Sequence, residues 1–327
     1  MRRLIVAAIA FCVFGCNKNE VNPEVDNTVH LAGYVGVPDG SAFASYWKDG
    51  VYTALGDGSI GTQVNSLYVD GRSVWVGGYR IPSSPPWRAV YWQDGVETSI
   101  AGGTASVTLI AARAGKMFGV WHDEKSRWVF LKNGKVQPMT DTAWNFGPTS
   151  LALVGDDMYV SGAASSPDNK YQYAQYWKNG IPMFRENVDS QAMSIFVHGD
   201  DIYLGGYYRP TSSSQVACYW KNGQRIDLSD PKKEMAAAWS IYVTNEHVYA
   251  SGTVDSRAVY WKDGEAFYLT DGTAMFAMAN CIAVREPDIH VGGYENNFPR
   301  YWKNGEKVKI DKDDTRGMIK YIVIGSN

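Results

Sequence analysis

The sequence has little that would mark a metalloenzyme, a nucleotide-binding protein or a nucleic-acid-binding protein. Its 327 residues contain 31 Lys and Arg against 34 Asp and Glu, without a basic stripe, so we expect no nucleic-acid partner. The five histidines are scattered and form no set with metal-ligand spacing, so we expect no metal. No P-loop, dinucleotide-binding fingerprint or nucleophile elbow is present, and we predict no cofactor.

The sequence also lacks a hydrophobic run long enough to cross a membrane. Its one strongly apolar run, residues 4–14, follows two arginines and is typical of a signal peptide. The run ends in Val13-Phe14-Gly15-Cys16, which resembles the lipobox of bacterial lipoproteins. This resemblance implies that residues 1–15 are a lipoprotein signal peptide and that Cys16 is lipidated. A plain cleaved signal is the alternative.

Residues 16–28 are polar, contain one proline and show no periodicity, so we predict a flexible tether. The rest of the chain would then contact the membrane only through its N-terminal lipid. We therefore expect a lipid-anchored protein of the bacterial cell envelope, at the outer membrane or cell surface.

One pentapeptide, Tyr-Trp-Lys-Asn-Gly or a close variant, recurs along the rest of the chain. Seven copies start 39 to 46 residues apart, at Tyr46, Tyr91, Phe130, Tyr176, Tyr219, Tyr260 and Tyr301. A period near forty fits a four-stranded propeller blade. Asn-Gly or Asp-Gly between two β-rich runs predicts a type I′ hairpin, because both turn residues need a positive φ.

The two ends of the repeat array complement each other. The first blade lacks its first strand, and residues 318–324 supply a strand of that type at the end of the chain. A C-terminal strand that completes the first blade removes both open sheet edges. We therefore predict that residues 29–327 form an all-β, seven-bladed propeller of four-stranded antiparallel blades, and we expect it to be monomeric.

Small polar residues open the first strand of six blades and are expected to border the central channel: Ser66, Thr108, Ser150, Ser194, Ser240 and Asn280. Cysteine is scarce. Outside the leader only Cys218 and Cys281 occur, in core positions of two different blades, where Cys281 is expected to take the place of Leu67. We predict free buried thiols rather than a disulfide.

The two faces of such a propeller differ. One face, the uniform face, carries short turns and the Asn-Gly hairpins. The opposite face, the variable face, carries connections that differ in length and composition, and such loops are where binding residues usually lie. Aromatic residues outside the repeat register are the ligand-binding candidates there: Trp87, Trp144, Trp239, Phe146, Tyr208, Phe276 and Phe298. Filling of gaps between loops is the alternative role.

The repeats resemble those of known propeller families. The glycine pairs before a loop resemble kelch repeats, and Tyr-Trp-Lys-Asp is similar to the YWTD repeat. The nearest resemblance is to uncharacterised bacterial lipoproteins built from YWKNG repeats. It covers residues 29–327 and implies the fold only.

The first functional hypothesis is a non-enzymatic module that binds a glycan or a protein on the variable face. The alternatives are a structural scaffold of an envelope complex, or a polysaccharide hydrolase or lyase. An enzyme would need paired carboxylates, and the candidates on the variable face are Glu124, Asp141, Glu186, Asp189, Asp255 and Glu295.

Overall fold

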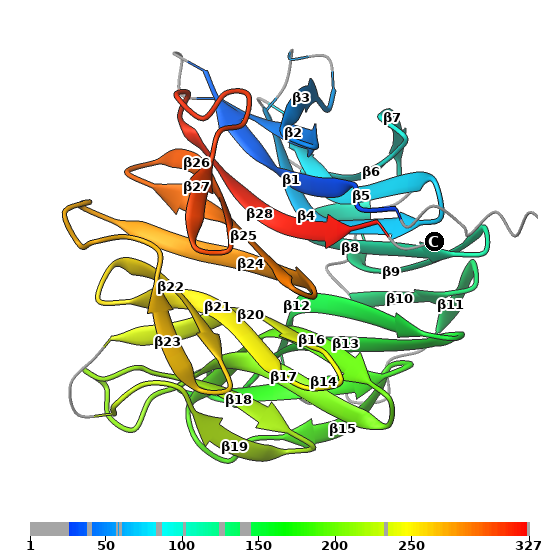
Figure 1. The fold of residues 1–327 in the computed structure, drawn as a ribbon. Helices are drawn as coiled ribbons and strands as arrows, with labels where there is room; N and C mark the ends of the chain where they lie inside the picture. Colours follow the sequence, from blue (N-terminus) through cyan, green and yellow to red (C-terminus); the bar gives the residue numbers. More distant parts are fainter. Residues whose placement is uncertain are drawn as a thin grey trace, which may run out of the picture.

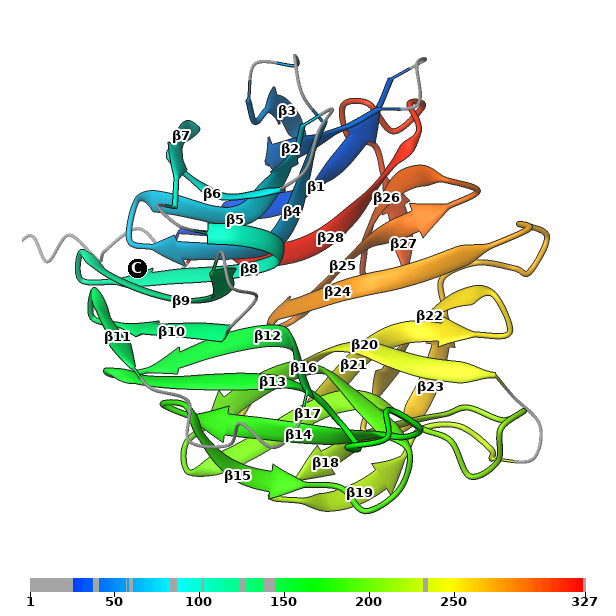
Figure 2. The same cartoon turned by 180° about the vertical axis from the view of Figure 1, so that it is seen from behind.

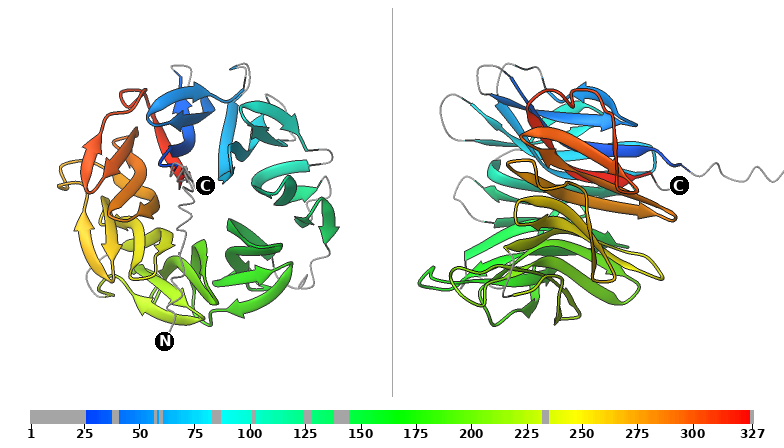
Figure 3. Two further views of the ribbon diagram at one scale, coloured as in Figure 1. Left: turned by 45° about the vertical axis from the view of Figure 1, so that its right-hand side comes forward. Right: turned by 60° about the vertical axis from the view of Figure 1, so that its left-hand side comes forward.

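The predicted seven-bladed propeller is confirmed. The structure, a computed structural model, describes residues 26–37, 41–56, 58, 61–82, 87–100, 103–123, 128–137, 145–231 and 235–325, with the side chains of residues 103–108, 145 and 146 not described. The predicted signal peptide, Cys16 and nearly all of the tether lie outside these residues. Seven antiparallel sheets of four strands each are arranged around a common axis (Figure 1; Figure 3, left).

The strands follow the repeat, and the four strands of each blade pair side by side in a fixed order. Blade 1 is β28 (Gly317–Ile324), β1 (Val29–Gly36), β2 (Ala42–Lys48) and β3 (Val51–Ala54). Blade 2 is β4 (Gly61–Asp70), β5 (Ser73–Ile81), β6 (Arg88–Gln93) and β7 (Val96–Ser99). Blade 3 is β8 (Gly103–Arg113), β9 (Lys116–Asp123), β10 (Trp128–Lys132) and β11 (Lys135–Gln137). Blade 4 is β12 (Asn145–Val154), β13 (Asp157–Ser165), β14 (Gln172–Lys178) and β15 (Ile181–Arg185).

The remaining blades have the same construction. Blade 5 is β16 (Ser190–His198), β17 (Asp201–Tyr208), β18 (Val216–Lys221) and β19 (Gln224–Asp227). Blade 6 is β20 (Ala236–Val243), β21 (Val248–Val254), β22 (Arg257–Lys262) and β23 (Glu265–Tyr268). Blade 7 is β24 (Ala277–Arg285), β25 (Asp288–Glu295), β26 (Phe298–Lys303) and β27 (Glu306–Val308). The first strand named in each blade faces the central channel and is called its inner strand.

The pentapeptide builds the third strand of each blade and the hairpin that follows it. Its tryptophan is the largest core side chain, and all six copies are at most 1% exposed: Trp47, Trp92, Trp177, Trp220, Trp261 and Trp302. Its Asn or Asp has a positive φ of 49° to 53° in every blade, as a type I′ turn requires. In six blades the same side chain accepts a hydrogen bond of 2.7 to 3.0 Å from the backbone N–H that starts the second strand.

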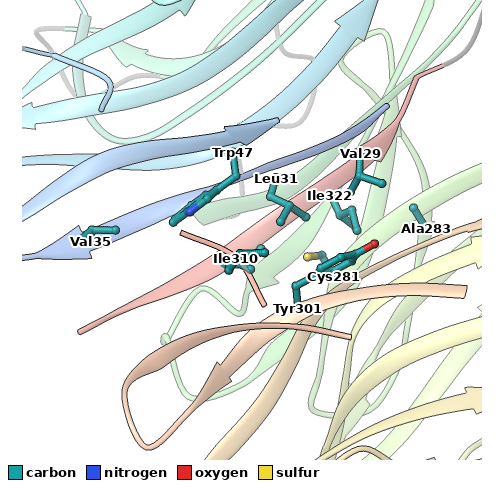
Figure 4. Close-up of a cluster of buried hydrophobic side chains, with 10 residues drawn as sticks. Val29, Leu31, Val35, Trp47, Cys281, Ala283, Tyr301, Ile310 and Ile322 are labelled. Atoms are coloured by element: carbon teal, nitrogen blue, oxygen red, sulfur yellow. The ribbon is translucent and has the colours of Figure 1, made fainter. Parts of the chain in front are cut away.

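The ring closes as the sequence predicts. Strand β1 pairs with β2 on one side and with β28 on the other, so the two ends of the described chain lie side by side (Figure 2). A buried cluster seals this junction, with Leu31 and Trp47 from blade 1, Tyr301 and Ile310 from blade 7 and its link, and Ile322 from β28 (Figure 4). Closure therefore rests on apolar packing as well as on the strand ladder.

The prediction that Trp239 lies in a loop outside the repeat register is wrong. It is the unpaired residue of a β-bulge in β20, between Ala238 and Ser240. The inner strands of five other blades have a bulge at the same place, with the residues Asn65, Thr149, Met193, Asn280 and Lys320. A bulge adds one residue to one strand and shifts the alternation of side chains after it, which counting along the sequence cannot reveal.

Because of the same bulge, the predicted ring of small polar residues is wrong in two blades. Ser66 and Ser240 hold the paired position after the bulge, and in β24 that position belongs to Cys281 rather than to Asn280. Cys281 therefore replaces a serine and not Leu67. In β8 the residue that lies as far from the hairpin turn as Ser66 does in β4 is Leu109 rather than Thr108. Both thiols are free and buried, as predicted.

Candidate functional site

The variable face carries a groove at the seam where the ring closes. The seam groove has a volume of about 810 Å³ and is lined by Tyr34, Gly36, Val37, Ser41, Ala42, Gln63, Asn297, Phe298, Asp314, Thr315, Arg316 and Gly317. These residues come mainly from the β1–β2 connection, the β25–β26 turn and the segment that leads into β28. The first group is more than 250 residues from the other two in sequence, and they meet only because the ring closes.

Backbone hydrogen bonds hold the walls of the seam groove together. The N–H of Gly36 donates to the carbonyl of Arg316 at 2.6 Å, and the N–H of Gly317 donates to the carbonyl of Asn297 at 2.8 Å. Asn297 has a φ of 67° in the β25–β26 turn, which directs the chain into Phe298. The groove is therefore built on paired strand ends rather than on one long loop.

Phe298 stands between two hollows. It lines the seam groove and also a second groove of about 540 Å³, whose other walls include Arg300, Lys307 and Asp313. The guanidinium of Arg300 lies 5.7 Å from the centre of its ring. Arg300 also donates to the carbonyl of Asp313 at 2.7 Å, so the second groove is braced at its edge.

Glu295 anchors the charged side of the second groove. Its carboxylate lies 3.2 Å from Nε of Arg300 and 2.7 Å from Nζ of Lys307. Burial raises the pKa of Glu295, but the hydrogen bonds from Lys307 and Arg300 outweigh burial and hold the pKa below its ordinary value. This carboxylate therefore stays ionised and structural rather than acting as a proton donor.

The other aromatic candidates lie apart from the seam groove. Trp87 is 41% exposed and stacks on Tyr79 in blade 2, with ring centres 5.1 Å apart. Phe276 is 39% exposed and stacks on Tyr294 at 5.8 Å. Both present one ring face outward at the variable face and cover a neighbouring tyrosine with the other.

Tyr208 and Trp239 are placed differently. Tyr208 is 7% exposed, donates from its hydroxyl to Asp227 at 3.0 Å and lies under the guanidinium of Arg225. Tyr208 thus belongs to the core of blade 5. Trp239 faces the central channel and meets the ring of Tyr207 edge-on at 6.4 Å.

Two candidates cannot be placed in this way. Trp144 lies outside the described residues, and Phe146 is described only through its backbone, which pairs with Ala164 in blade 4. Among the candidates whose side chains are described, every ring contact is with a residue outside the candidate set.

The carboxylates considered for catalysis are held by other groups where the structure describes them. Glu186 accepts from the indole of Trp220 at 2.7 Å, Asp189 lies 3.5 Å from Arg209, and Asp255 accepts from a backbone N–H at 3.0 Å. Within the described chain, each carboxyl group with a shifted pKa is shifted downward. Glu124 and Asp141 lie outside the described residues.

The described segments contain neither a metal centre nor a spanning helix. No three His, Cys, Asp or Glu side chains among them gather closely enough to hold a metal ion. No helix in the same segments is long and apolar enough to cross a bilayer.

Phe298 was predictable from the sequence as a loop aromatic residue, but the residues that surround it in the seam groove were not. Tyr34 belongs to a repeated strand end, and Asp314 and Arg316 follow a charged turn that carries no motif. The complementarity of the two chain ends was the available signal, because it implies that residues 34–42 meet residues 314–317.

No family model matches the chain, and no curated protein sequence matches it. Solved structures do match. An acylaminoacyl peptidase from Pyrococcus horikoshii aligns with a TM-score of 0.50 at 14% identity, over 77% of this chain and 46% of that one. A puromycin-hydrolysing peptidase from Mycobacterium tuberculosis aligns with a TM-score of 0.50 at 13% identity, over 76% and 46%.

The β-propeller domain of the Trilobed protease from Pyrococcus furiosus aligns over 76% of this chain and 82% of that one, at 10% identity and a TM-score of 0.49. The present chain thus spans about half the length of the two peptidases. At these identities the likeness shows the propeller fold alone.

Proposed function

We propose that this chain is an exported, lipid-anchored binding module that takes a glycan in the seam groove of its variable face. The observation that carries the proposal is the lining of that groove. Two aromatic side chains, Tyr34 and Phe298, stand among amide, hydroxyl and charged groups in a hollow of about 810 Å³. Aromatic faces that contact sugar C–H groups, with polar groups at the rim, suit a carbohydrate.

The position of the chain's start supports the anchoring part of the proposal. Thr28 accepts a backbone hydrogen bond from Gly325 at 2.8 Å, and Arg285 at the end of β24 donates to the carbonyl of Asp26 at 2.7 Å. The chain therefore enters the propeller at the uniform face. A lipid on Cys16 would leave at most roughly 40 Å of tether, so the uniform face would turn toward the membrane and the variable face away from it.

Binding to a glycan array tests the proposal. The chain is produced without residues 1–15 and with Cys16→Ser, and the best array ligand is then titrated by calorimetry. Phe298→Ala and Arg316→Ala should each weaken binding about tenfold, the effect of losing roughly 1.4 kcal/mol. Arg316 is exposed and Phe298 only partly buried, so both variants should keep the wild-type unfolding temperature.

Phe267→Ala is the matched control, because Phe267 is also partly exposed but lies on the outer strand of blade 6. It should bind like the wild type. If no glycan binds, or if both groove variants bind normally, the glycan assignment is wrong. Capture of an envelope protein that competes at Phe298 would replace the glycan with a protein ligand.

A further inference from the structure

The central channel is a third hollow, separate from the seam groove and from the second groove beside Phe298. The inner strands β4, β12, β16, β20, β24 and β28 enclose a cavity of about 570 Å³. Five of the six aligned bulge residues line it: Thr149, Met193, Trp239, Asn280 and Lys320. A repeated backbone irregularity therefore places five different side chains at one level of the channel.

Three bulge side chains also tie neighbouring blades together. Thr149 donates to the carbonyl of Ala192 at 2.7 Å, and Asn280 donates to the carbonyl of Ile319 at 2.7 Å. Lys320 donates to the carbonyl of Val64 at 2.8 Å. The neutral side chains of Thr149 and Asn280 make the same kind of hydrogen bond between blades. The hydrogen bond therefore does not explain why residue 320 carries a positive charge.

Lys320 is the one charged residue among the described residues that line the cavity. An ammonium group has three donors, and the tie to Val64 uses one of them. Burial lowers the pKa of Lys320 to about 8. The centre of the Tyr321 ring lies 5.9 Å from this ammonium, but no carboxylate is among the described residues that line the cavity. A buried ammonium without an anion beside it is costly.

The cavity that Lys320 lines has apolar and aromatic side chains in its walls, together with hydroxyl and amide groups such as those of Ser194, Ser240 and Asn280. Met193, Trp239 and Met318 line the same cavity from β16, β20 and β28, and the rings of Phe196 and Tyr242 in its walls meet at 4.7 Å. A cavity of this size is within the range of small-molecule sites, roughly 300–1,000 Å³. One positive charge in such walls matches one negative charge on an apolar body.

We propose that the channel binds a small organic monocarboxylate whose carboxylate pairs with the ammonium of Lys320 and whose apolar body contacts Trp239, Met193 and Met318. A monoanion fits better than a phosphate dianion, because a second negative charge would have no partner among the described lining residues. The proposal does not depend on the seam groove or its glycan.

Because binding would depend on the charged form of Lys320, ligand affinity should fall as the pH rises. The other titratable groups that line the channel are Tyr68, Tyr242, Cys281 and Tyr321, and burial raises the pKa of each, so they stay neutral near pH 8. On β1, the strand paired with β28, burial lowers the pKa of His30 and raises that of Tyr34. Lys320 is then the group whose charge changes between pH 7 and 9.5.

The experiment is calorimetric titration of the chain lacking residues 1–15, with Cys16→Ser. The probes are hexanoate, 4-phenylbutyrate and indole-3-acetate, each compared with its primary amide, and phenyl phosphate. At least one carboxylate should bind ten times more tightly than its amide at pH 7, and its affinity should fall about tenfold at pH 9.5. Lys320→Met should remove this preference, while Lys320→Arg should keep binding but lose the pH dependence.

Lys48→Met, at an exposed motif lysine, is the matched control and should behave like the wild type. The wild-type comparison of acid with amide stands even if Lys320→Met fails to fold. The proposal is overturned if no carboxylate binds, if acid and amide bind equally, or if affinity is the same at both pH values. Tighter binding of phenyl phosphate would overturn the monocarboxylate assignment. Phe298→Ala should leave channel binding unchanged, which separates this test from that of the seam groove.

Discussion

The motif lysine has a partner that lies outside the motif. In three blades an aspartate at the start of the second strand forms an ion pair with it, in the pairs Asp157–Lys178, Asp201–Lys221 and Asp288–Lys303 at 2.7 to 2.9 Å. Hydrogen bonds from Asn179 and Lys178 lower the pKa of Asp157 to about 2. The aspartate thus joins the two strands at the uniform face.

Asp157 should make stability depend on acid pH. Because its pKa is lower in the folded chain than the ordinary 3.8, the stabilisation is complete above pH 4 and is lost as pH falls toward 2. Asp157 is about two-fifths exposed, so the effect on the unfolding temperature should be modest. Asp157→Asn should unfold at a lower temperature than the wild type at pH 6, and the difference should shrink at pH 2.

Thermal unfolding followed by circular dichroism at pH 6, 4, 3 and 2 measures this. Asp200→Asn, at an exposed turn position, is the control and should follow the wild type at every pH. If the difference in unfolding temperature between Asp157→Asn and the wild type is the same from pH 6 to pH 2, the Asp157 ion pair does not cause the loss of stability in acid.

Single residues were predictable from sequence where the repeat determines their environment. The motif tryptophans and the free thiols of Cys218 and Cys281 are examples, because both occupy core positions. Trp239 was not predictable, because its position depends on a backbone bulge. Tyr208 was taken for a loop residue, although its partners Asp227 and Arg225 lie on the outer strand of the same blade.

At the scale of elements, the type I′ hairpin is the most regular unit of the fold. Asn222 has a φ of 50°, and its side-chain oxygen accepts from the N–H of Ile202 at 2.9 Å. Blades 1, 2 and 6 use Asp at the same place, so the requirement is a positive φ together with an oxygen acceptor. The Asn-Gly and Asp-Gly signals were therefore sufficient to predict the hairpins.

Substitutions at Asn222 should separate these two requirements. Asn222→Ala loses both side-chain hydrogen bonds and keeps a Cβ in the left-handed region without the polar side chain that makes it tolerable for Asn, so it should destabilise by about 2 kcal/mol. Asn222→Gly loses the acceptor and the donor to Asp201 but relieves the positive φ, so it should cost about 1 kcal/mol. Asn222→Asp keeps the acceptor but places a second carboxylate beside Asp201, so it should also destabilise at neutral pH. Urea unfolding measures the midpoints, and equal losses for Ala and Gly would contradict the role of φ.

The bulges of the inner strands are elements that sequence could not reveal. No single residue type marks all six of them: two are asparagines, Asn65 and Asn280, and the others are Thr149, Met193, Trp239 and Lys320. Their common feature is a backbone position, which only the strand register defines. The channel site proposed for Lys320 depends on that register.

At the scale of the whole molecule, closure of the ring determines where the seam groove and the channel cavity lie. Strand β28 pairs with β1 and contributes Lys320 to the channel. The segment that leads into β28 forms one wall of the seam groove. The number of blades and the closing strand were predictable, because repeats can be counted and an incomplete first blade needs a partner. The seam groove was not, because its walls are defined by how two chain ends pack.

Hydrogen exchange followed by mass spectrometry tests this closure most directly. It is applied to the chain without residues 1–15, and the amides of β28 are compared with those of two other inner strands, β20 and β24. Because β28 is hydrogen-bonded to β1 and packed in the sealing cluster, its amides should be protected as strongly as theirs. Exchange of β28 within seconds, as in an unpaired tail, would contradict the closed ring and with it the seam groove and the channel site.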